Sequence, residues 1–308
     1  MSGDKQGLML PVWLAERYDG TYLDGRRFDD LRFLQCKLIL QPDRFTSRHV
    51  FKEFARLVHR AAEATGVTYH HTPKLEQRPE VREVLFLDTG DFHLYNNAFI
   101  LRRRIPYQDG FPIGAPEIVF KYRHTDPQKT AELDMRPHIS GDYRIKFKAE
   151  ALPLKDGLGG MRMLYSHNVE FHMESAIMAD RMSMERIAQA LPALQSIAWE
   201  KDERAELVGG TIVEEVLQDI GELDFGNRMR AMCNVALWRN RGDHAPLIGE
   251  FAFQLKFRRR EELTDDALGR CEAFFFALQA EARDWIQLGA TKTGVVYRLK
   301  GNPPHAHE

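Results

Sequence analysis

Apolar and polar residues alternate along many short segments of this chain, as they do in strands with one buried face. Residues 117–123 carry the pattern clearly, with apolar Ile118, Phe120 and Tyr122 set between charged Glu117, Lys121 and Arg123. Similar alternation or β-rich composition predicts further strands over residues 32–40, 83–89, 98–105, 131–137, 144–151, 167–174, 196–207, 211–220, 228–239 and 247–257.

Other segments carry their apolar residues at helical spacing. This spacing predicts helices over residues 47–64, 175–191 and 264–286, and a short closing element is expected over residues 294–299. Thr264 stands directly before the third helix and is expected to cap it. Strands that mostly follow one another, with a few helices between them, predict an α+β fold.

The polar rows of these strands are charged, and this leaves two architectures open. An antiparallel sheet can bury its apolar row under helices and leave the other face in solvent. The same sheet can instead close into a barrel, with the charged rows facing an internal tunnel and the helices packed outside. Cations held together in such a tunnel would favour a polyanionic ligand, because charges act more strongly where water is partly excluded.

Composition narrows the class of protein. The 308 residues are 44% hydrophobic with a formal net charge of −2, which is typical of a globular protein and argues against a general nucleic-acid binder. No apolar run reaches the length of about 20 residues that spans a bilayer, so no membrane partner is expected. Cys36, Cys233 and Cys271 have no disulfide or zinc spacing, and they fit the reduced cytoplasm.

Two segments resemble a known family. Residues 87–104 (LDTGDFHLYNNAFILRRR) and 117–123 (EIVFKYR) are similar to the CYTH or triphosphate tunnel metalloenzyme superfamily. In that family an Asp-Thr strand leads through a Leu-Tyr hairpin to a Leu-Arg-x-Arg strand and then to a strand ending in Lys or Arg. Weaker matches continue in order to residue 299. The resemblance implies a closed antiparallel barrel of about eight strands, a tunnel, with helices outside.

The same resemblance implies the chemistry of the tunnel. Basic side chains would bind the triphosphate or polyphosphate of a small ligand, such as tripolyphosphate, a nucleoside or thiamine triphosphate, or polyphosphate itself. Carboxylates would hold Mg²⁺ or Mn²⁺. Family members include triphosphatases, class IV adenylate cyclases and polyphosphate polymerases.

This chain departs from the family pattern in its first strand. The family motif Glu-x-Glu-x-Lys is replaced by Phe33, Gln35 and Lys37, so the lysine is present and both glutamates are missing. In the late Glu-x-Glu strand Glu250 remains, but Ala252 and Gln254 follow on the same face. Mg²⁺ prefers anionic oxygen ligands, so the phosphate-binding half of the site is better preserved than the metal half.

The strand pattern and the resemblance together select individual residues as candidates for phosphate binding. The guanidinium groups of Arg102 and Arg104 suit bidentate contacts with phosphate oxygens, although both could also be solvated strand residues. The full set of expected phosphate-binding residues is Lys37, Arg102, Arg104, Lys121, Arg123, Arg204, Lys256 and Lys292.

Three carboxylates are candidate metal ligands: Glu132, Asp134 and Glu250. Glu250 is also the candidate catalytic residue. Glu132 and Asp134 could equally pair with arginines across a sheet. The row of Glu170, His172 and Glu174 could bind a metal or form a solvated face.

We therefore expect a single tunnel domain over residues 31–300, preceded by an extension (1–30), interrupted by an insertion at about 141–166, and followed by a tail (301–308). Two functions stay open. One is a metal-dependent hydrolase of phosphoanhydrides, and the other is a non-catalytic polyanion-binding or regulatory module. A third reading is that only the fold is shared, with the charged faces serving solubility or a protein interface.

Overall fold

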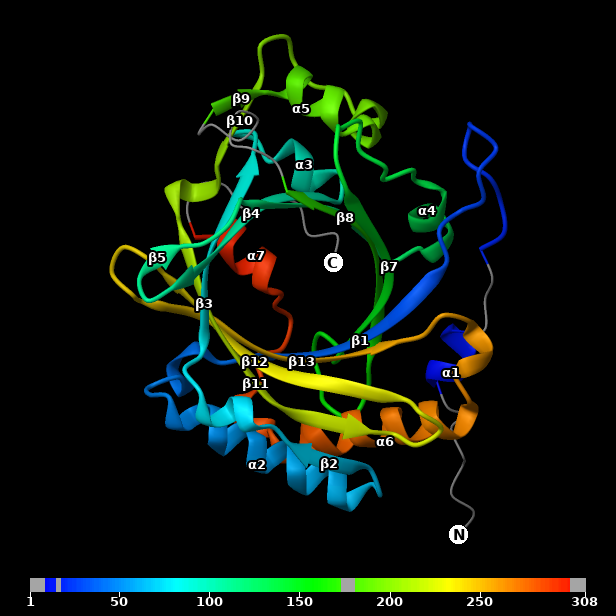
Figure 1. Cartoon of the computed structure of the whole chain (residues 1–308), viewed down its shortest axis with the longest axis vertical. Helices are drawn as coiled ribbons and strands as arrows, with labels where there is room; N and C mark the ends of the chain where they lie inside the picture. Colours follow the sequence, from blue (N-terminus) through cyan, green and yellow to red (C-terminus); the bar gives the residue numbers. More distant parts are fainter. Residues whose placement is uncertain (1–8, 15–17, 173–180, 300–308) are drawn as a thin grey trace.

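Nine strands close into a barrel in the computed structural model, which describes residues 9–14, 18–172 and 181–299 (Figure 1). The barrel strands, in spatial order, are β11 (Val213–Asp224), β12 (Arg230–Asn240), β13 (Pro246–Lys256), β1 (Leu31–Leu40), β7 (Tyr143–Leu152), β8 (Arg162–His172), β6 (Glu117–His124), β4 (Phe99–Gln108) and β3 (Glu80–Asp88). The circle closes where β3 pairs with β11, at Val84 opposite Val213. The expected closed barrel is thus confirmed, with nine strands rather than about eight.

The barrel is mixed rather than wholly antiparallel. β1 runs parallel to β7, and every other neighbouring pair in the circle is antiparallel. Four short strands extend the wall: β2 (Thr68–His71), β5 (Phe111–Pro112), β9 (Arg181–Ser183) and β10 (Arg204–Leu207). The segment 141–166, expected to be an insertion, contains β7, which matches the strand predicted over 144–151, and the first part of β8.

Helices cover the barrel outside, with one exception. The helices of the described residues are α1 (Met9–Trp13), α2 (His49–Ala64), α3 (His93–Asn96), α4 (Pro127–Glu132), α5 (Met184–Ala190), α6 (Asp265–Glu281) and α7 (Lys292–Tyr297). α2 and α6 lie side by side under the β11–β13 wall, whereas α7 enters the barrel (Figure 1). Among the described helices, none has the length and apolar character to cross a membrane.

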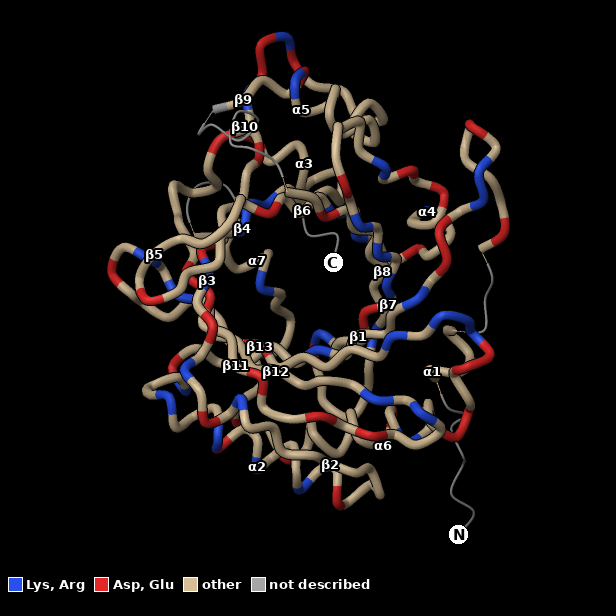
Figure 2. The backbone as a smooth tube through the Cα atoms, viewed as in Figure 1, with Lys and Arg blue, Asp and Glu red and all other residues tan. Residues whose placement is uncertain are grey.

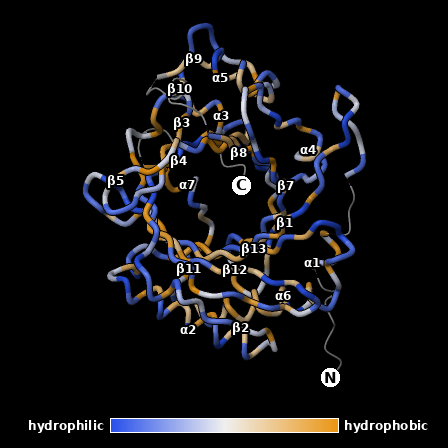
Figure 3. Tube along the Cα trace, in the orientation of Figure 1, coloured by the Kyte–Doolittle hydropathy of each residue, from blue (hydrophilic) through white to orange (hydrophobic). Residues whose placement is uncertain are grey.

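The main core fills the space between that wall and the helices. The outward row of β1, including Leu34, Cys36 and Leu38, is fully buried there. Phe54 of α2 and Phe274 of α6 pack on the same layer, where hydrophobic residues gather (Figure 3). Burial of these side chains provides most of the stabilisation expected for such a wall. The N-terminal extension joins this core, because Glu272 of α6 accepts hydrogen bonds from the Met9 and Leu10 amides.

Several element predictions hold and others do not. Helices over 47–64 and 264–286 are present as α2 and α6, with the Thr264 hydroxyl accepting from the Ala267 amide. The strand predicted over 131–137 is wrong, because residues 127–132 form α4. The Asp126 side chain caps this helix and Pro127 stands in its first turn, which favours a helix start. Of the helix predicted over 175–191, residues 175–180 lie outside the described residues and α5 begins at Met184.

Candidate functional site

The barrel encloses a cavity of about 420 Å³, within the range of small-molecule sites. Its lining is dominated by charge. Among the described residues, ten cations line it against five carboxylates, a formal excess of five positive charges. The cations are Lys37, Arg82, Arg102, Arg104, Lys121, Arg123, Arg144, Lys146, Lys148 and Lys292, and the carboxylates are Glu117, Glu150, Glu170, Glu215 and Glu250. Blue segments on the β4 and β7 walls mark several of these positions (Figure 2).

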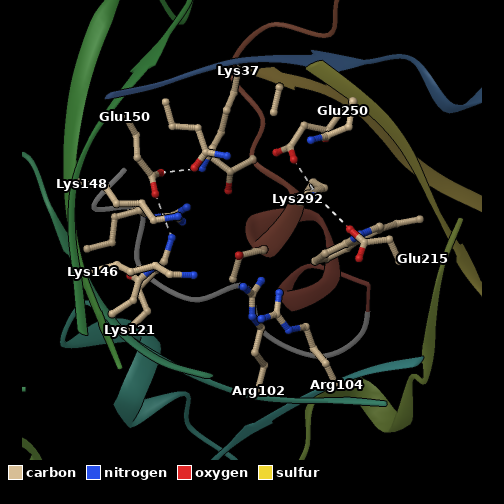
Figure 4. Close-up of a pocket in the computed structure, with 18 of the residues that line it drawn as sticks. Lys37, Arg102, Arg104, Lys121, Lys146, Lys148, Glu150, Glu215, Glu250 and Lys292 are labelled. Atoms are coloured by element: carbon tan, nitrogen blue, oxygen red, sulfur yellow. Dashed lines mark hydrogen bonds and ion pairs between the residues drawn. The ribbon is translucent and has the colours of Figure 1, made fainter. Parts of the chain in front are cut away.

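Strand alternation explains why these side chains converge. On β6 the apolar row packs outward, with Phe120 fully buried, so Lys121 and Arg123 point inward. On β4, Leu101 packs outward and Arg102 points inward. The labelled side chains in Figure 4, from β1, β4, β6, β7, β11, β13 and α7, face one another across the cavity. The closed sheet therefore concentrates charges that lie far apart in the sequence.

An apolar floor closes one half of the barrel interior. Ile39, Phe86 and Trp238 continue the inward rows and pack around Tyr297 of α7. The Tyr297 ring stacks on Tyr95, with ring centroids 4.2 Å apart. α7 thus plugs the barrel from inside, and its first residue, Lys292, points toward the charged half (Figure 4).

Glu150 anchors the lysines of one wall. Its carboxylate lies 2.8 Å from the Lys37 Nζ and 2.9 Å from the Lys121 Nζ, and it accepts a hydrogen bond from Ser166. Although burial opposes ionisation, the positive charges of Lys121 and Lys37 hold the pKa of Glu150 well below its usual range. The carboxylate is therefore charged and acts as a fixed counterion.

Glu215 plays the same role on the opposite wall. It pairs with Arg82 and with Lys292, at 3.1 Å for the latter, and accepts a 2.7 Å hydrogen bond from the Trp238 indole. Burial opposes its ionisation too, but Lys292 and Arg82 hold the pKa of Glu215 well below its usual range. Glu250 lies 2.8 Å from Lys292 on the other side.

Two cations have no such counterion. Within the described part of the chain, neither Arg102 nor Lys148 forms an ion pair with a carboxylate. Lys148 donates instead to the neutral Gln254 amide oxygen at 2.9 Å, and burial lowers the pKa of Lys148 to about 8. Burial, together with the neighbouring Arg104, lowers the pKa of Arg102 to about 10. Both groups have unsatisfied positive charge that an anion would complement.

The structure brings most of the predicted site residues together. Seven of them line the cavity: Lys37, Arg102, Arg104, Lys121, Arg123, Lys292 and Glu250. Arg204 does not, because it lies exposed on β10 outside the barrel. Lys256 is exposed at the end of β13, with its Nζ 6.0 Å from the Phe33 ring.

The predicted metal ligands Glu132 and Asp134 lie outside the barrel, so the structure does not bring them together with Glu250 in the tunnel. Glu132 ends α4 and accepts a hydrogen bond from Gln128, and Asp134 pairs with Arg136. The alternative of pairing with an arginine is therefore the one observed for Asp134, although within one loop and not across a sheet. The proposed metal row is also divided: Glu170 lines the cavity, His172 is exposed, and Glu174 lies outside the described residues.

The expected set of phosphate-binding residues lacks the cations of β7. Arg144, Lys146, Lys148 and Glu150 occupy every second position of the strand and therefore share one face. The strand predicted over 144–151 was enough to place them on its polar row. Arg82 and Glu215 were missed for another reason. They face each other across the β3–β11 pair that closes the barrel, and no local pattern predicts that pairing.

The tunnel residues do not fit a divalent metal. In the β1–β13 register Gln35 lies opposite Gln254 and Lys37 opposite Ala252, so neutral groups stand where the family motif has glutamates. Each of the five tunnel carboxylates is paired with at least one cation. No three acidic, histidine or cysteine residues of the described chain are grouped so that they could hold a metal ion.

Comparisons with known proteins find similarity only at the level of structure. No family model and no curated protein matches the chain. A Hippeastrum protein named "putative adenylyl cyclase", for which a dominant triphosphatase activity is described, matches with 13% identity and a TM-score of 0.41, over 89% of this chain and 98% of its own. A "putative adenylate cyclase" from Bacillus halodurans matches with 11% identity and a TM-score of 0.32, over 80% and 90%. PH1819 from Pyrococcus horikoshii matches with 8% identity and a TM-score of 0.30, over 80% and 89%.

At such low sequence identities and TM-scores, the similarity is one of chain path alone, and it gives no information about the substrate. In this molecule the hairpin motif of residues 87–104 forms part of a closed barrel whose cations point inward. A closed barrel with helices packed outside is the fold that the sequence resemblance implied.

Proposed function

We propose that the tunnel binds the linked phosphate groups of a small triphosphate or polyphosphate ligand. The observation that carries the proposal is the convergence of Lys37, Arg102, Arg104, Lys121 and Arg123 on one cavity with a formal excess of five positive charges. A ligand with several adjacent negative charges would offset this excess at once, inside walls that strengthen each contact.

The distribution of cations favours linked phosphates over a single anion. Arg102 and Arg104 project from β4, while Lys146 and Lys148 project from β7, and the two pairs face the same space from different walls (Figure 4). A single phosphate carries about two negative charges at neutral pH, fewer than the formal excess of five positive charges on the lining. A chain of phosphates can contact both pairs, with arginine forks and lysine ammonium groups serving successive phosphoryl oxygens.

Binding without turnover is the function that this geometry supports best. The carboxylates that metal-dependent hydrolysis requires are engaged with cations, and the first-strand glutamates are replaced. Hydrolysis of a phosphoanhydride is the second candidate, because Glu215 and Glu250 lie in the same cavity as the cations. The two functions differ in whether bound tripolyphosphate is cleaved.

Calorimetric titration tests the proposal. We expect tripolyphosphate to bind with a stoichiometry of one per chain, and orthophosphate to bind far more weakly. Arg102→Ala combined with Arg104→Ala should weaken tripolyphosphate binding by about a hundredfold, since two charge-assisted contacts are lost. Arg204→Ala, outside the barrel, serves as the matched control and should leave binding unchanged.

Two results would decide against the proposal. Absence of tripolyphosphate binding to the folded wild-type chain would contradict it, as would equal losses in the double variant and the Arg204→Ala control. Release of phosphate from tripolyphosphate with Mg²⁺ or Mn²⁺, abolished by Glu250→Gln, would instead establish the second candidate.

A further inference from the structure

The ammonium group of Lys292 lies between two carboxylates at the inner end of the cavity. Its Nζ is 2.8 Å from Glu250 and 3.1 Å from Glu215, and it lies over the Trp238 ring, 4.6 Å from the centroid. The three partners come from β13, β11 and β12, so a single cation joins three strands of the wall (Figure 4).

Two neighbouring buried carboxylates require positive charge nearby. Without it, one of them would take up a proton or the pair would destabilise the fold. A divalent metal is one source of that charge, and a lysine is another. Here the lysine is present and its side chain is only 15% exposed.

The position of Lys292 is fixed by its element. The Thr291 hydroxyl caps α7 by accepting from the Gly294 amide at 3.0 Å. At the other end of the helix Tyr297 stacks on Tyr95 inside the apolar floor. The ammonium is thus delivered by a packed plug rather than by a mobile surface side chain, and it is in place before any ligand arrives.

We propose that Lys292 is the resident cation of the tunnel and that the chain binds its phosphate ligand without a divalent metal. This inference rests on the proposed function and adds the source of positive charge at the Glu215–Glu250 pair. The positive charge of Lys292 offsets the negative charge of the two carboxylates, so that they do not repel the anionic phosphates of the ligand. Lys292 is thus a positioning residue: it places a positive charge beside Glu215 and Glu250 and does not itself react.

The first test needs no variant. Tripolyphosphate is titrated into wild-type protein in excess EDTA, and separately in MnCl₂ with the free ligand concentration corrected for Mn²⁺ complexes. We expect equal affinity in both. Binding that is lost in EDTA and restored by Mn²⁺ would overturn the inference and leave the proposed function standing. Absence of binding in both would overturn the proposed function and the inference with it.

The second test uses Mn²⁺ alone, followed by its electron paramagnetic resonance signal. Wild-type protein should leave the signal of free Mn²⁺ unchanged. Stoichiometric loss of the free signal, reversed in Glu250→Gln, would place a metal at this pair and contradict the proposal.

The third test removes the resident cation. Lys292→Met should weaken tripolyphosphate binding in EDTA by about tenfold or more, because one positive charge is lost, Glu250 loses its ion pair with Lys292, and Glu215 keeps only its pair with Arg82. If that variant does not fold, Lys292→Met with Glu250→Gln removes one charge of each sign and should retain the fold while still binding more weakly. Lys129→Met on α4, exposed and outside the barrel, is the control. Wild-type affinity in the folded Lys292 variant would contradict the proposal.

Discussion

Lys148 illustrates how a single side chain carries the chemistry of this tunnel. It sits on β7 with a neutral amide as its hydrogen-bond partner, and burial lowers its pKa to about 8. At pH 7 the group is mostly protonated, and it loses its charge as the pH rises through 8. A bound phosphate would favour the charged form and raise the pKa again.

This pKa gives a pH-dependent prediction. Tripolyphosphate affinity should fall between about pH 7 and about pH 9 in wild-type protein, relative to a Lys148→Arg variant that keeps its charge. The comparison of the two proteins cancels the ionisation of the ligand itself. Calorimetry at several pH values measures it, and parallel profiles for the two proteins would show that Lys148 does not contact the ligand.

Most of the tunnel cations could be predicted at the residue scale. Parity on β1, β4 and β6 is enough to place Lys37, Arg102 and Lys121 on the polar row. Parity could not distinguish a residue inside the barrel from one on a short strand outside it. Arg204 is such a case, since it alternates as regularly as the others but lies on β10, beyond β3.

At the scale of elements, Asp88 fixes the hairpin that supports the plug. Its carboxylate is 1% exposed and accepts hydrogen bonds from the amides of Thr89, Leu94 and Tyr95, at 2.8 to 2.9 Å. Burial outweighs these hydrogen bonds and raises the pKa of Asp88 to about 6. The turn holds α3, and through Tyr95 it supports Tyr297 of the plug helix.

Removal of this carboxylate should destabilise the whole barrel. Asp88→Ala leaves three buried amides without an acceptor, so we expect the free energy of unfolding to fall by about 2–4 kcal/mol. Asp91→Ala in the same hairpin is the control, because Asp91 is exposed and contributes only its backbone carbonyl, to Asn96. Urea unfolding of both variants measures the difference, and a loss below about 0.5 kcal/mol for Asp88→Ala would contradict the role given to this turn.

The strand predicted from alternation over residues 131–137 is absent, because a local helix-start signal precedes it. Residues 131–137 alternate like a strand, yet Asp126 and Pro127 start a helix just before them. The segment 141–166 is expected to be an insertion in the tunnel domain, although a strand is also expected within it, over residues 144–151. It forms barrel strands because its own outward row, including Phe147 and Ala149, completes the core beneath Leu34 and Tyr165.

At the scale of the whole molecule, closure decides what the charges do. The alternation of each strand is the same in an open sheet and in a barrel, so the sequence left both architectures open. The pairing of β3 with β11 settles the matter, and it joins residues about 130 positions apart. Closure turns the polar rows from a solvated face into the lining of a cavity, where each charge interacts more strongly with a ligand.

Adjacent arginines on β4 provide the most direct test of this account. Arg102 points into the cavity, whereas Arg103 is absent from its lining and contacts Glu83 at 3.6 Å. We predict that Arg102→Ala weakens tripolyphosphate binding by about tenfold or more, and that Arg103→Ala changes it by less than about twofold, with both variants folded by circular dichroism. Equal losses in the two variants, or a larger loss in Arg103→Ala, would contradict the claim that the tunnel lining binds the phosphates.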